Sequence, residues 1–221
     1  MLALCLATFS GAAAELSDIE KRWLRCVWPV VQYDKTAQML LDTAVQPQPA
    51  LNAAPLALSY IGGRCKLVFS VRGTAQADTA LNGLDADLQD AAIELMAAHE
   101  LGHCQRYQSG AWHGMPAGFV ARESAALHLA SLAAWAELQA ARREEGYGDL
   151  IGLAWTERHR APLYARLHGW LPALRSADMV LGSHHDTRAW VELARAGLPG
   201  SRLSIFDAPA GLCAAGLQLL H

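Results

Sequence analysis

The sequence predicts an α+β protein that is mainly helical, with a small antiparallel sheet preceding its longest helices. Two observations support this fold class. Residues 56–73 contain two short runs with the composition of strands, separated by Gly62-Gly63. Downstream, apolar residues recur at the helical spacing of three and four over 85–107, and an alanine-rich stretch with helical character covers 119–145. We expect the second of these long helices to fold back antiparallel onto the first.

Length and composition indicate one domain with a sizeable core. The chain has 221 residues, of which 52% are hydrophobic and 18% are charged. Residues 1–14 combine a short apolar run with an Ala-x-Ala-like site, which predicts a signal peptide followed by a single domain over 15–221. Within that domain we expect a core at about 56–145 and a helical C-terminal part at 150–221. The predicted location is therefore periplasmic or secreted.

The same numbers exclude some partners. The net charge is −3 and no basic stripe is interleaved with aromatics, so nucleic acid is not expected to bind. No later apolar run reaches the length of about 20 residues that spans a bilayer, so no stable membrane insertion is expected after signal cleavage. Because no Lys or Arg precedes the apolar run at the N-terminus, a cytosolic location stays open as an alternative.

The elements before the long helices follow from local signals. Ser17 and Glu20 form a capping-box signature, so a helix should begin there and run to about Val27, before Pro29. A helical pattern resumes over 36–45, and three prolines make 46–55 a loop. Residues 56–61 and 65–73 are then the two strands of a hairpin, rich in the β-branched and aromatic residues that strands prefer.

The remainder of the chain is predicted to be helical in pieces. One face of the helix over 85–107 carries apolar and small residues together with two histidines: Leu88, Ala92, Leu95, His99, Gly102 and His103. Ser109-Gly110 should end it. After the helix over 119–145, shorter helices are expected over 154–169, 171–180 and 184–196. A tail punctuated by Pro and Gly, with Cys213, closes the chain.

Cysteine usage agrees with export. Removal of the signal peptide takes Cys5 and leaves an even number of cysteines, Cys26, Cys65, Cys104 and Cys213. In an oxidising compartment these four could form two disulfides. Three pairings are open, and four buried thiols are the alternative.

The stretch AAHELGHCQRY, residues 97–107, carries the clearest chemical signal. His99 and His103 are four residues apart and so lie on one helical face, where both imidazoles can point at a single metal ion. Glu100 is rotated by about 100° from His99 and can reach a water at that ion without binding the metal itself. A buried histidine pair also needs partners for its ring nitrogens, and a metal would supply one.

A catalytic zinc site takes three protein ligands, so a third is needed. Glu123, near the start of the second long helix and on a face of small residues, is the strongest candidate. His128 is rotated by about 140° from Glu123, and Glu137 lies about 21 Å further along the axis, so only one of the three can be right. His113, in a Gly/Trp loop, is another alternative. A carboxylate favoured by the helix dipole is the structural interpretation of Glu123.

On these residues the chain resembles the gluzincins, the group of zinc peptidases that includes thermolysin, and more closely the compact minigluzincins. The motifs are HELGH at 99–103 and the downstream Glu123-Ser124-Ala125-Ala126. The family's second motif reads roughly Glu-x-x-Ala-Asp/Asn, and Leu127 stands here in place of its last residue, which typically supports a ligating histidine. The resemblance implies Zn²⁺ held by His99, His103 and Glu123, and an edge strand before the histidine helix that binds an extended peptide or protein substrate.

The expected activity is zinc-dependent endopeptidase cleavage, with Glu100 as the general base for a zinc-activated water. An oxyanion donor could come from His184 or His185, which the sequence does not separate, with Asp186 orienting the imidazole. A solvent-facing cap built by Ser183 or Asp186 is the structural alternative. For the whole protein, the alternatives are a non-catalytic or weakly active protein that retains the metal site, and a cytosolic regulatory metallopeptidase.

Overall fold

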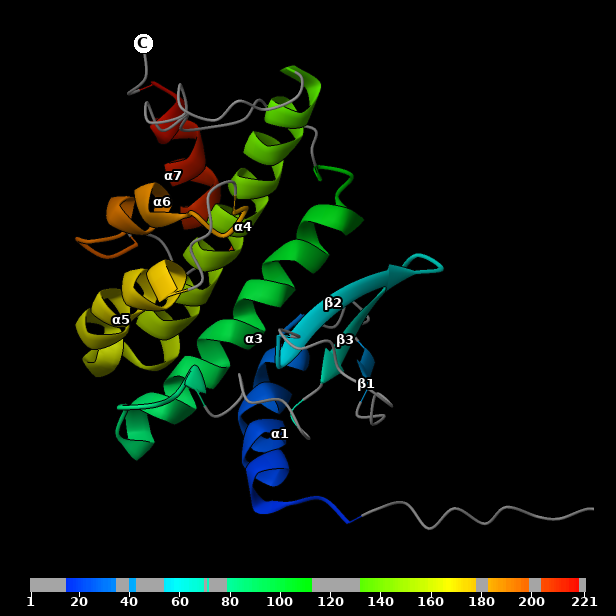
Figure 1. Cartoon of the computed structure of the whole chain (residues 1–221), viewed down its shortest axis with the longest axis vertical. Coiled ribbons are helices and arrows are strands. Elements are labelled where there is room, and N and C mark those ends of the chain that lie inside the picture. The colour runs from blue at the N-terminus through cyan, green and yellow to red at the C-terminus, as the bar shows by residue number, and fades with distance from the viewer. Residues whose placement is uncertain are drawn as a thin grey trace, which may run out of the picture.

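The structure is a computed structural model that describes residues 15–34, 40–42, 54–69, 71, 79–112, 132–177, 183–198 and 204–218. The predicted signal peptide and most of the predicted loop at 46–55 lie outside these residues. As predicted, the described chain is α+β and mainly helical with a small sheet (Figure 1). The elements in chain order are α1 (Asp18–Val31), β1 (Leu40–Asp42), β2 (Leu56–Ile61), β3 (Arg64–Phe69), α3 (Ala86–Gln108), α4 (Leu132–His159), the 3-10 helix η2 (Ala161–Leu163), α5 (Tyr164–Ala177), α6 (Arg188–Leu193) and α7 (Asp207–Gln218).

The sheet has the strand order β1-β3-β2. β2 and β3 form the predicted antiparallel hairpin, and Gly62 and Gly63 turn it with φ angles of 60° and 76° that favour glycine. Among the described residues no strand pairs with the outer side of β2, which is therefore an edge strand. This edge faces α3, which β2 contacts.

β1 corrects the helix predicted over 36–45. Residues 40–42 pair in parallel with β3, and the other residues of that stretch lie outside the described chain. A helical spacing over so few residues is ambiguous. Residues 40–42 form a strand because the backbone N–H and C=O groups on the side of β3 away from β2 gain hydrogen-bond partners from β1.

α1 begins as predicted and ends later than predicted. The Ser17 side chain accepts a hydrogen bond from the Glu20 backbone N–H, and the Glu20 side chain accepts one from the Ser17 N–H, which completes the capping box. The helix then continues past Pro29 to Val31. A proline in the last turn removes one backbone hydrogen bond, and the buried Val30 and Val31 keep this turn packed.

The two long helices α3 and α4 lie side by side and run antiparallel, with α3 between the sheet and α4 (Figure 1). Glycines allow this close approach. A Cβ atom at Gly102 would lie 2.9 Å from the Ile151 side chain, and one at Gly152 would lie 2.8 Å from the Leu95 carbonyl oxygen. Glycine lowers the intrinsic stability of a helix, and at Gly102 its missing side chain makes room for the contact with Ile151.

The predicted end of the second long helix at residue 145 is wrong. α4 runs through Gly146 and Gly148 to His159, so the helix predicted over 154–169 begins inside it. A glycine after a helical stretch is often a helix stop. Here both glycines face side chains of other elements instead: a Cβ at Gly146 would overlap the Trp190 ring, and one at Gly148 the His99 ring. The start predicted at 119 lies outside the described residues.

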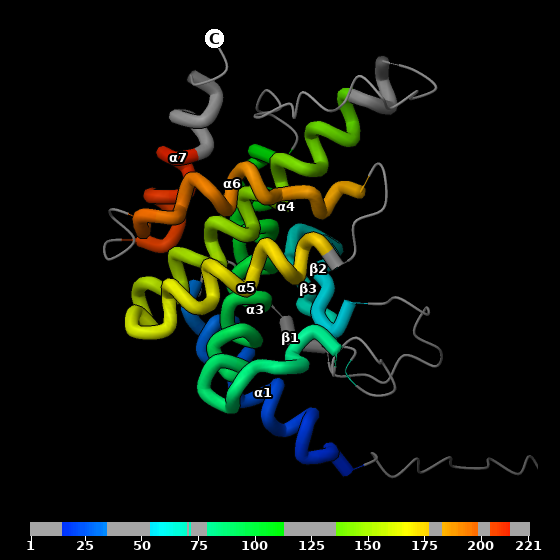
Figure 2. The backbone as a smooth tube through the Cα atoms, turned by 60° about the vertical axis from the view of Figure 1, so that its left-hand side comes forward, coloured from blue at the N-terminus to red at the C-terminus, as the bar shows by residue number. Residues whose placement is uncertain are grey.

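The C-terminal third also differs in its boundaries. α5 runs without a break through Gly169 and Pro172, and α6 is shorter than the predicted 184–196. α7 occupies part of the predicted tail. All three helices contact α4, and Figure 2 shows α5 and α6 lying over it. Among the described helices, none combines the length and apolar character needed to cross a membrane.

Within the described chain, a disulfide joins Cys65 on β3 to Cys104 on α3. It fastens the central strand to the helix at the residue directly after His103. Cys26 on α1 is a free, buried thiol, and burial together with the nearby Asp90 raises its pKa to about 12. The possible disulfide through Cys26 is therefore not formed, and the side chain of Cys213 lies outside the described residues.

Candidate metal centre

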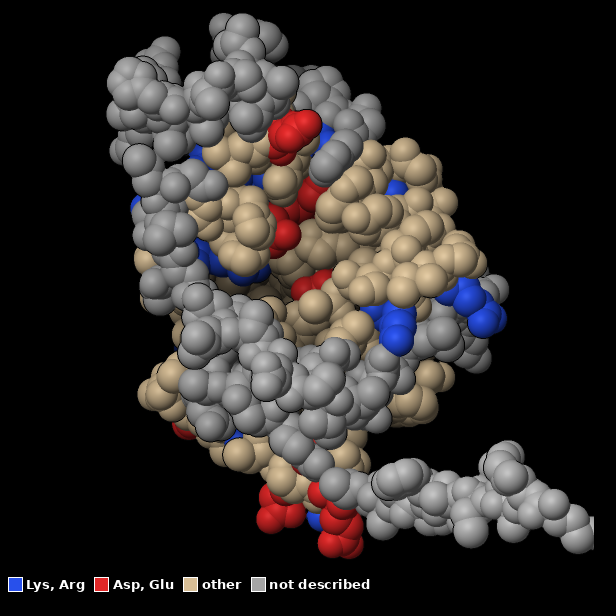
Figure 3. Space-filling view, turned by 45° about the vertical axis from the view of Figure 1, so that its right-hand side comes forward, with Lys and Arg blue, Asp and Glu red and all other residues tan. Residues whose placement is uncertain are grey.

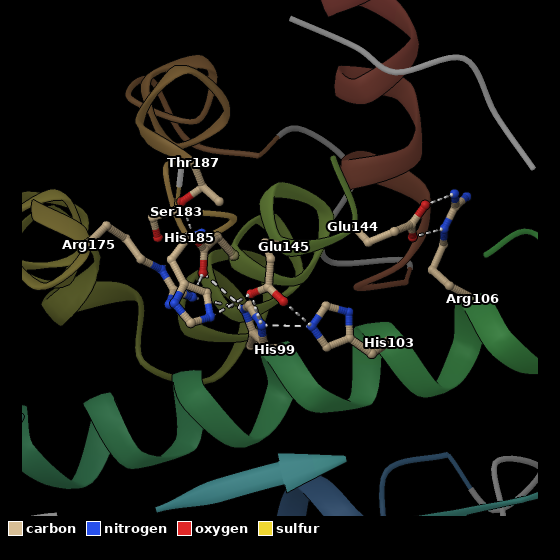
Figure 4. A network of polar contacts seen from close by, with 10 residues as sticks. His99, His103, Arg106, Glu144, Glu145, Arg175, Ser183, His185 and Thr187 are labelled. Carbon is tan, nitrogen blue, oxygen red and sulfur yellow. Dashed lines mark hydrogen bonds and ion pairs between the residues drawn. The ribbon is translucent and has the colours of Figure 1, made fainter. Parts of the chain in front are cut away.

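Two histidines on α3 converge where the helix faces α4. His99 and His103 are both buried, and their Nε2 atoms lie 2.9 Å apart (Figure 4). The sequence placed the pair on one buried helical face, and this is confirmed. The ring of Trp112 stands edge-on to the ring of His103, with centroids 5.2 Å apart, and limits its rotation.

The third group is Glu145, which α4 carries to the same point (Figure 4). Its Oε2 atom lies 3.3 Å from His99 Nε2, and its Oε1 atom lies 3.7 Å from His103 Nε2. One ligand atom from each of the three residues falls within 4.8 Å of the others, an arrangement that could hold a metal ion. Two imidazole nitrogens and a carboxylate oxygen form one of the donor sets of catalytic zinc sites.

Glu123, the third ligand expected from the sequence, lies outside the described residues, as do the alternatives His113 and His128. Glu137 is on α4 but exposed, and it is not part of the cluster. Within the described chain, the carboxylate that joins the two histidines is thus Glu145.

Asp149 holds His99 from behind. It lies one helical turn after Glu145 on α4 and is fully buried, and its Oδ1 atom accepts a hydrogen bond from His99 Nδ1 at 2.9 Å. Arg175 of α5 donates to both oxygens of this carboxylate, at 3.0 Å from Nε to Oδ2, and the Thr187 hydroxyl donates to Oδ2 at 2.5 Å. Because Nδ1 donates to Asp149, Nε2 is the ring nitrogen of His99 that faces the centre.

A signal for Glu145 and Asp149 is present in the sequence. The stretch EGYGD, residues 145–149, has a glutamate followed four residues later by an aspartate. This is the spacing of the family's second motif, in which Leu127 replaces the acidic or amide residue after Glu123. This signal is masked in the sequence by Gly146 and Gly148, which make residue 145 look like a helix end. Gly148 is instead where the His99 ring packs, since a Cβ there would lie 2.7 Å from ring atoms.

The three side chains of the cluster have strongly shifted pKa values, in opposite directions for the two histidines. Burial would lower the pKa of His99, but the carboxylates of Asp149 and Glu145 outweigh it and raise this pKa to about 10. Burial and the charge of His99 lower the pKa of His103 to about 3. For Glu145, burial would raise the pKa, yet His99 and His103 lower it to about 2. Among the protein groups alone, Glu145 is therefore ionised and one histidine carries the positive charge.

Glu100 lies beside the cluster without belonging to it. It is half-buried on α3, and burial is the main cause that raises its pKa to about 7. The backbone N–H of Leu58 donates a hydrogen bond to its carboxylate, so Glu100 stands between the edge strand β2 and the histidines. A carboxyl group with this pKa can both accept and release a proton near neutral pH.

The structure separates His184 from His185. His185 is half-buried with its Nε2 atom 3.6 Å from Glu145 Oε2, whereas His184 is exposed (Figure 4). His184, His185 and Glu145 form a second group of ligand atoms within 4.8 Å of one another. Because Glu145 belongs to both groups, His185 lies next to the group of His99, His103 and Glu145. Asp186 contacts Arg188 at 3.0 Å, and the Ser183 hydroxyl accepts from the His185 backbone N–H at 3.1 Å.

One face of the molecule is hollowed. Figure 3 shows a hollow along which acidic side chains gather, with basic side chains at its margins. An acidic surface of this kind favours a cation.

Comparison of the chain with known proteins finds no matching protein family, no matching curated protein and no matching solved structure.

Proposed function

We propose that this protein is a zinc-dependent endopeptidase of the gluzincin type, exported from the cytoplasm. One observation carries the proposal: a His-His-Glu donor set, His99, His103 and Glu145, stands next to a glutamate, Glu100, that is not part of it. A purely structural metal site has no use for a carboxyl group that stands beside the donor set without belonging to it. In this proposal Glu145 takes the role expected of Glu123, and Asp149 takes the role of the acidic or amide residue that Leu127 replaces in the motif after Glu123.

The residues present suit zinc. Catalytic zinc sites use three protein ligands drawn from His, Glu, Asp and Cys, and they keep a further position for water or substrate. The carboxylate–histidine pair of Asp149 and His99 is the support that such ligands commonly have. Zinc bound here would act as a Lewis acid toward the substrate carbonyl and lower the pKa of water.

Glu100 would act as general base and then as general acid. Its carboxylate would take a proton from the attacking water and deliver it to the leaving amine. His185 would donate a hydrogen bond to the oxygen on which negative charge develops, since it is half-buried and pairs with Glu145 at 3.6 Å, whereas His184 is exposed. Glu100 would thus transfer the proton, and His185 would stabilise the negative charge on the oxygen.

The substrate would be an extended peptide segment laid along β2. This strand is at the edge of the sheet, and the Leu58 backbone contacts Glu100, so a peptide paired with it would pass directly over the base. The disulfide between β3 and α3 would keep the strands and the histidine helix in register. Such a bond also agrees with an oxidising compartment outside the cytoplasm.

The test combines zinc content with cleavage of a fluorescein-labelled casein by the purified protein. We expect one zinc per chain in the wild type. Glu100→Gln should keep the zinc and lose about 100-fold or more of the activity, because general base catalysis typically contributes that much. Glu145→Ala should lose the zinc. Glu137→Ala, an exposed glutamate on the same helix, is the matched control and should behave as wild type.

Two outcomes would contradict parts of this proposal. If Glu100→Gln cleaves casein at the wild-type rate, the assigned chemistry is wrong, and a metal-binding protein without this activity is the better description. If Glu145→Ala keeps its zinc while Glu123→Ala loses it, the third ligand is Glu123.

A further inference from the structure

Three aromatic rings form a continuous stack between β2 and the C-terminal end of α3. The Tyr60 ring, from β2, lies parallel to the Tyr107 ring, with centroids 5.2 Å apart and an interplanar angle of 8°. Tyr107 in turn lies parallel to Trp112, at 4.2 Å and 9°. Trp112 then meets the edge of His103. The stack therefore connects the edge strand to a residue of the candidate metal centre.

The stack has a defined position relative to the base. In the hairpin, Ile61 pairs with Arg64 across the two-residue turn, so residues 57, 59 and 61 bond to β3. The backbone groups of Leu58 and Tyr60 then point to the free edge, in agreement with the hydrogen bond from Leu58 to Glu100. Tyr60 is two residues, or about 7 Å, further along the edge than Leu58. On α3, Tyr107 lies one turn beyond His103.

A peptide that pairs antiparallel with β2 would meet the stack with its N-terminal part. It runs opposite to β2, so the residue across from Tyr60 precedes the residue across from Leu58 by two positions. Because the Leu58 position is at Glu100, the stack lies about two residues before the scissile bond. Tyr60 is 40% exposed, so its ring is within reach of a substrate side chain.

We propose that the stack of Tyr60, Tyr107 and Trp112 is a substrate subsite that selects an aromatic side chain about two residues before the scissile bond. This inference rests on the proposed peptidase function and adds its substrate class. Aromatic rings attract one another in offset or edge-to-face contact, beyond the burial of apolar area. The stacked rings are already ordered, so little conformational freedom is lost when a further ring binds.

The test measures binding in a variant that does not cleave. The zinc-loaded Glu100→Gln protein is titrated into two fluorescein-labelled decapeptides of alternating Ala and Ser, one of which carries a central Phe, and fluorescence anisotropy is followed. We expect the Phe peptide to bind about 2- to 10-fold more tightly. Adding Tyr60→Ala should bring the ratio to about 1, while Tyr60→Phe should preserve it.

Ile61→Ala is the matched control. Ile61 is the next residue of β2 and is 64% exposed, but its side chain points to the other face of the strand, so the ratio should not change. Thermal unfolding and zinc content of each variant show whether the fold and the centre are intact. If the stack is purely structural, Tyr60→Ala should change thermal unfolding or zinc content and leave the preference for the Phe peptide unchanged.

The outcomes separate this inference from the proposed function. Equal binding of the two peptides, including no binding of either, would overturn the subsite, as would a preference that survives Tyr60→Ala. If the preference is present but wild-type protein cleaves no peptide, only the peptidase function fails. If wild type cleaves peptides without an aromatic residue enriched before the scissile bond, only the subsite fails.

Discussion

Asp149 and His99 form the hydrogen bond that orients the candidate metal centre, with 2.9 Å between Oδ1 and Nδ1. The bond joins the two long helices, because His99 belongs to α3 and Asp149 to α4. Arg175 and Thr187 hold the far side of the same carboxylate. The centre therefore depends on α5 and on the segment before α6, although neither supplies a residue to the His-His-Glu group.

Replacing Asp149 should weaken metal binding without removing a ligand. We expect Asp149→Asn to raise the zinc dissociation constant about 10- to 100-fold, because the orientation and basicity of His99 depend on the carboxylate. Competition with a chromophoric chelator measures this constant. Asp90→Asn is the control, since Asp90 on α3 also pairs with an arginine, Arg22 at 2.6 Å, but lies away from the centre. An unchanged constant in Asp149→Asn would contradict the role given to this residue.

Gly148 should not tolerate even a methyl group. In Gly148→Ala the new Cβ would lie 2.7 Å from atoms of the His99 ring, which packs between the helices and has little room to move. We expect a lower midpoint of thermal unfolding and weaker zinc binding together. Gly169→Ala, in helix α5 with no atom within 4 Å of the new Cβ, should instead stabilise the protein by up to about 1 kcal/mol. Equal behaviour of the two variants would show that the close contact at Gly148 does not matter.

A buried ion pair beside the centre, Arg106 with Glu144, also joins the two long helices and should contribute strongly to their stability. Arg106 of α3 donates two hydrogen bonds of 2.8 Å to Glu144 of α4, and Arg143 donates to the same carboxylate. Glu144→Gln would leave buried arginines without their counter-charge, at a cost of about 3–5 kcal/mol in the free energy of unfolding. Urea titration at neutral pH with a chelator present measures this loss apart from metal binding. A cost below about 1 kcal/mol would contradict it.

The stabilisation from the ion pair of Arg106 with Glu144 should depend on pH. Burial would raise the pKa of Glu144, but the hydrogen bonds from Arg106 and Arg143 outweigh it and lower this pKa below its ordinary value. The stabilisation is then complete above the ordinary pKa of 4.5 and is lost as pH falls through the lower value of the folded state. The difference in stability between wild type and Glu144→Gln should therefore shrink on acidification, and a constant difference would disprove the assignment.

Reduction of the disulfide should loosen the sheet from the histidine helix. Cys65 and Cys104 are 39 residues apart in sequence, and a closed loop of that size corresponds to about 4 kcal/mol of stability in the chain-entropy account. Urea unfolding with and without a reductant tests this value. The double variant Cys65→Ala/Cys104→Ala should match the reduced wild type and no longer respond to the reductant. A stability that the reductant leaves unchanged would argue against the bond.

Local features of this protein were predictable from its sequence because they depend on neighbours within a few residues. The capping box at Ser17, the hairpin around Gly62-Gly63 and the helix that carries His99 and His103 are all of this kind. The pairing of the two histidines needs only the helical period, since one turn brings them to the same face.

Longer-range features needed the tertiary structure. Residues 40–42 form a strand because β3 offers them backbone partners, and α4 continues through Gly146 and Gly148 because other side chains occupy the space that a Cβ would fill. Local propensity describes neither effect. His184 and His185 could not be separated for the same reason, since only the tertiary structure shows that His185 is half-buried and pairs with Glu145 while His184 is exposed.

The sequence by itself determined that two imidazoles and a glutamate share one buried helix, which is the part of the centre set by the geometry of a single turn. Only the tertiary structure decided which carboxylate joins them among the described residues. That choice depends on how α4 is aligned against α3, and the alignment is set by contacts between distant residues, such as the approach of Gly148 to His99 and the hydrogen bond from His99 to Asp149.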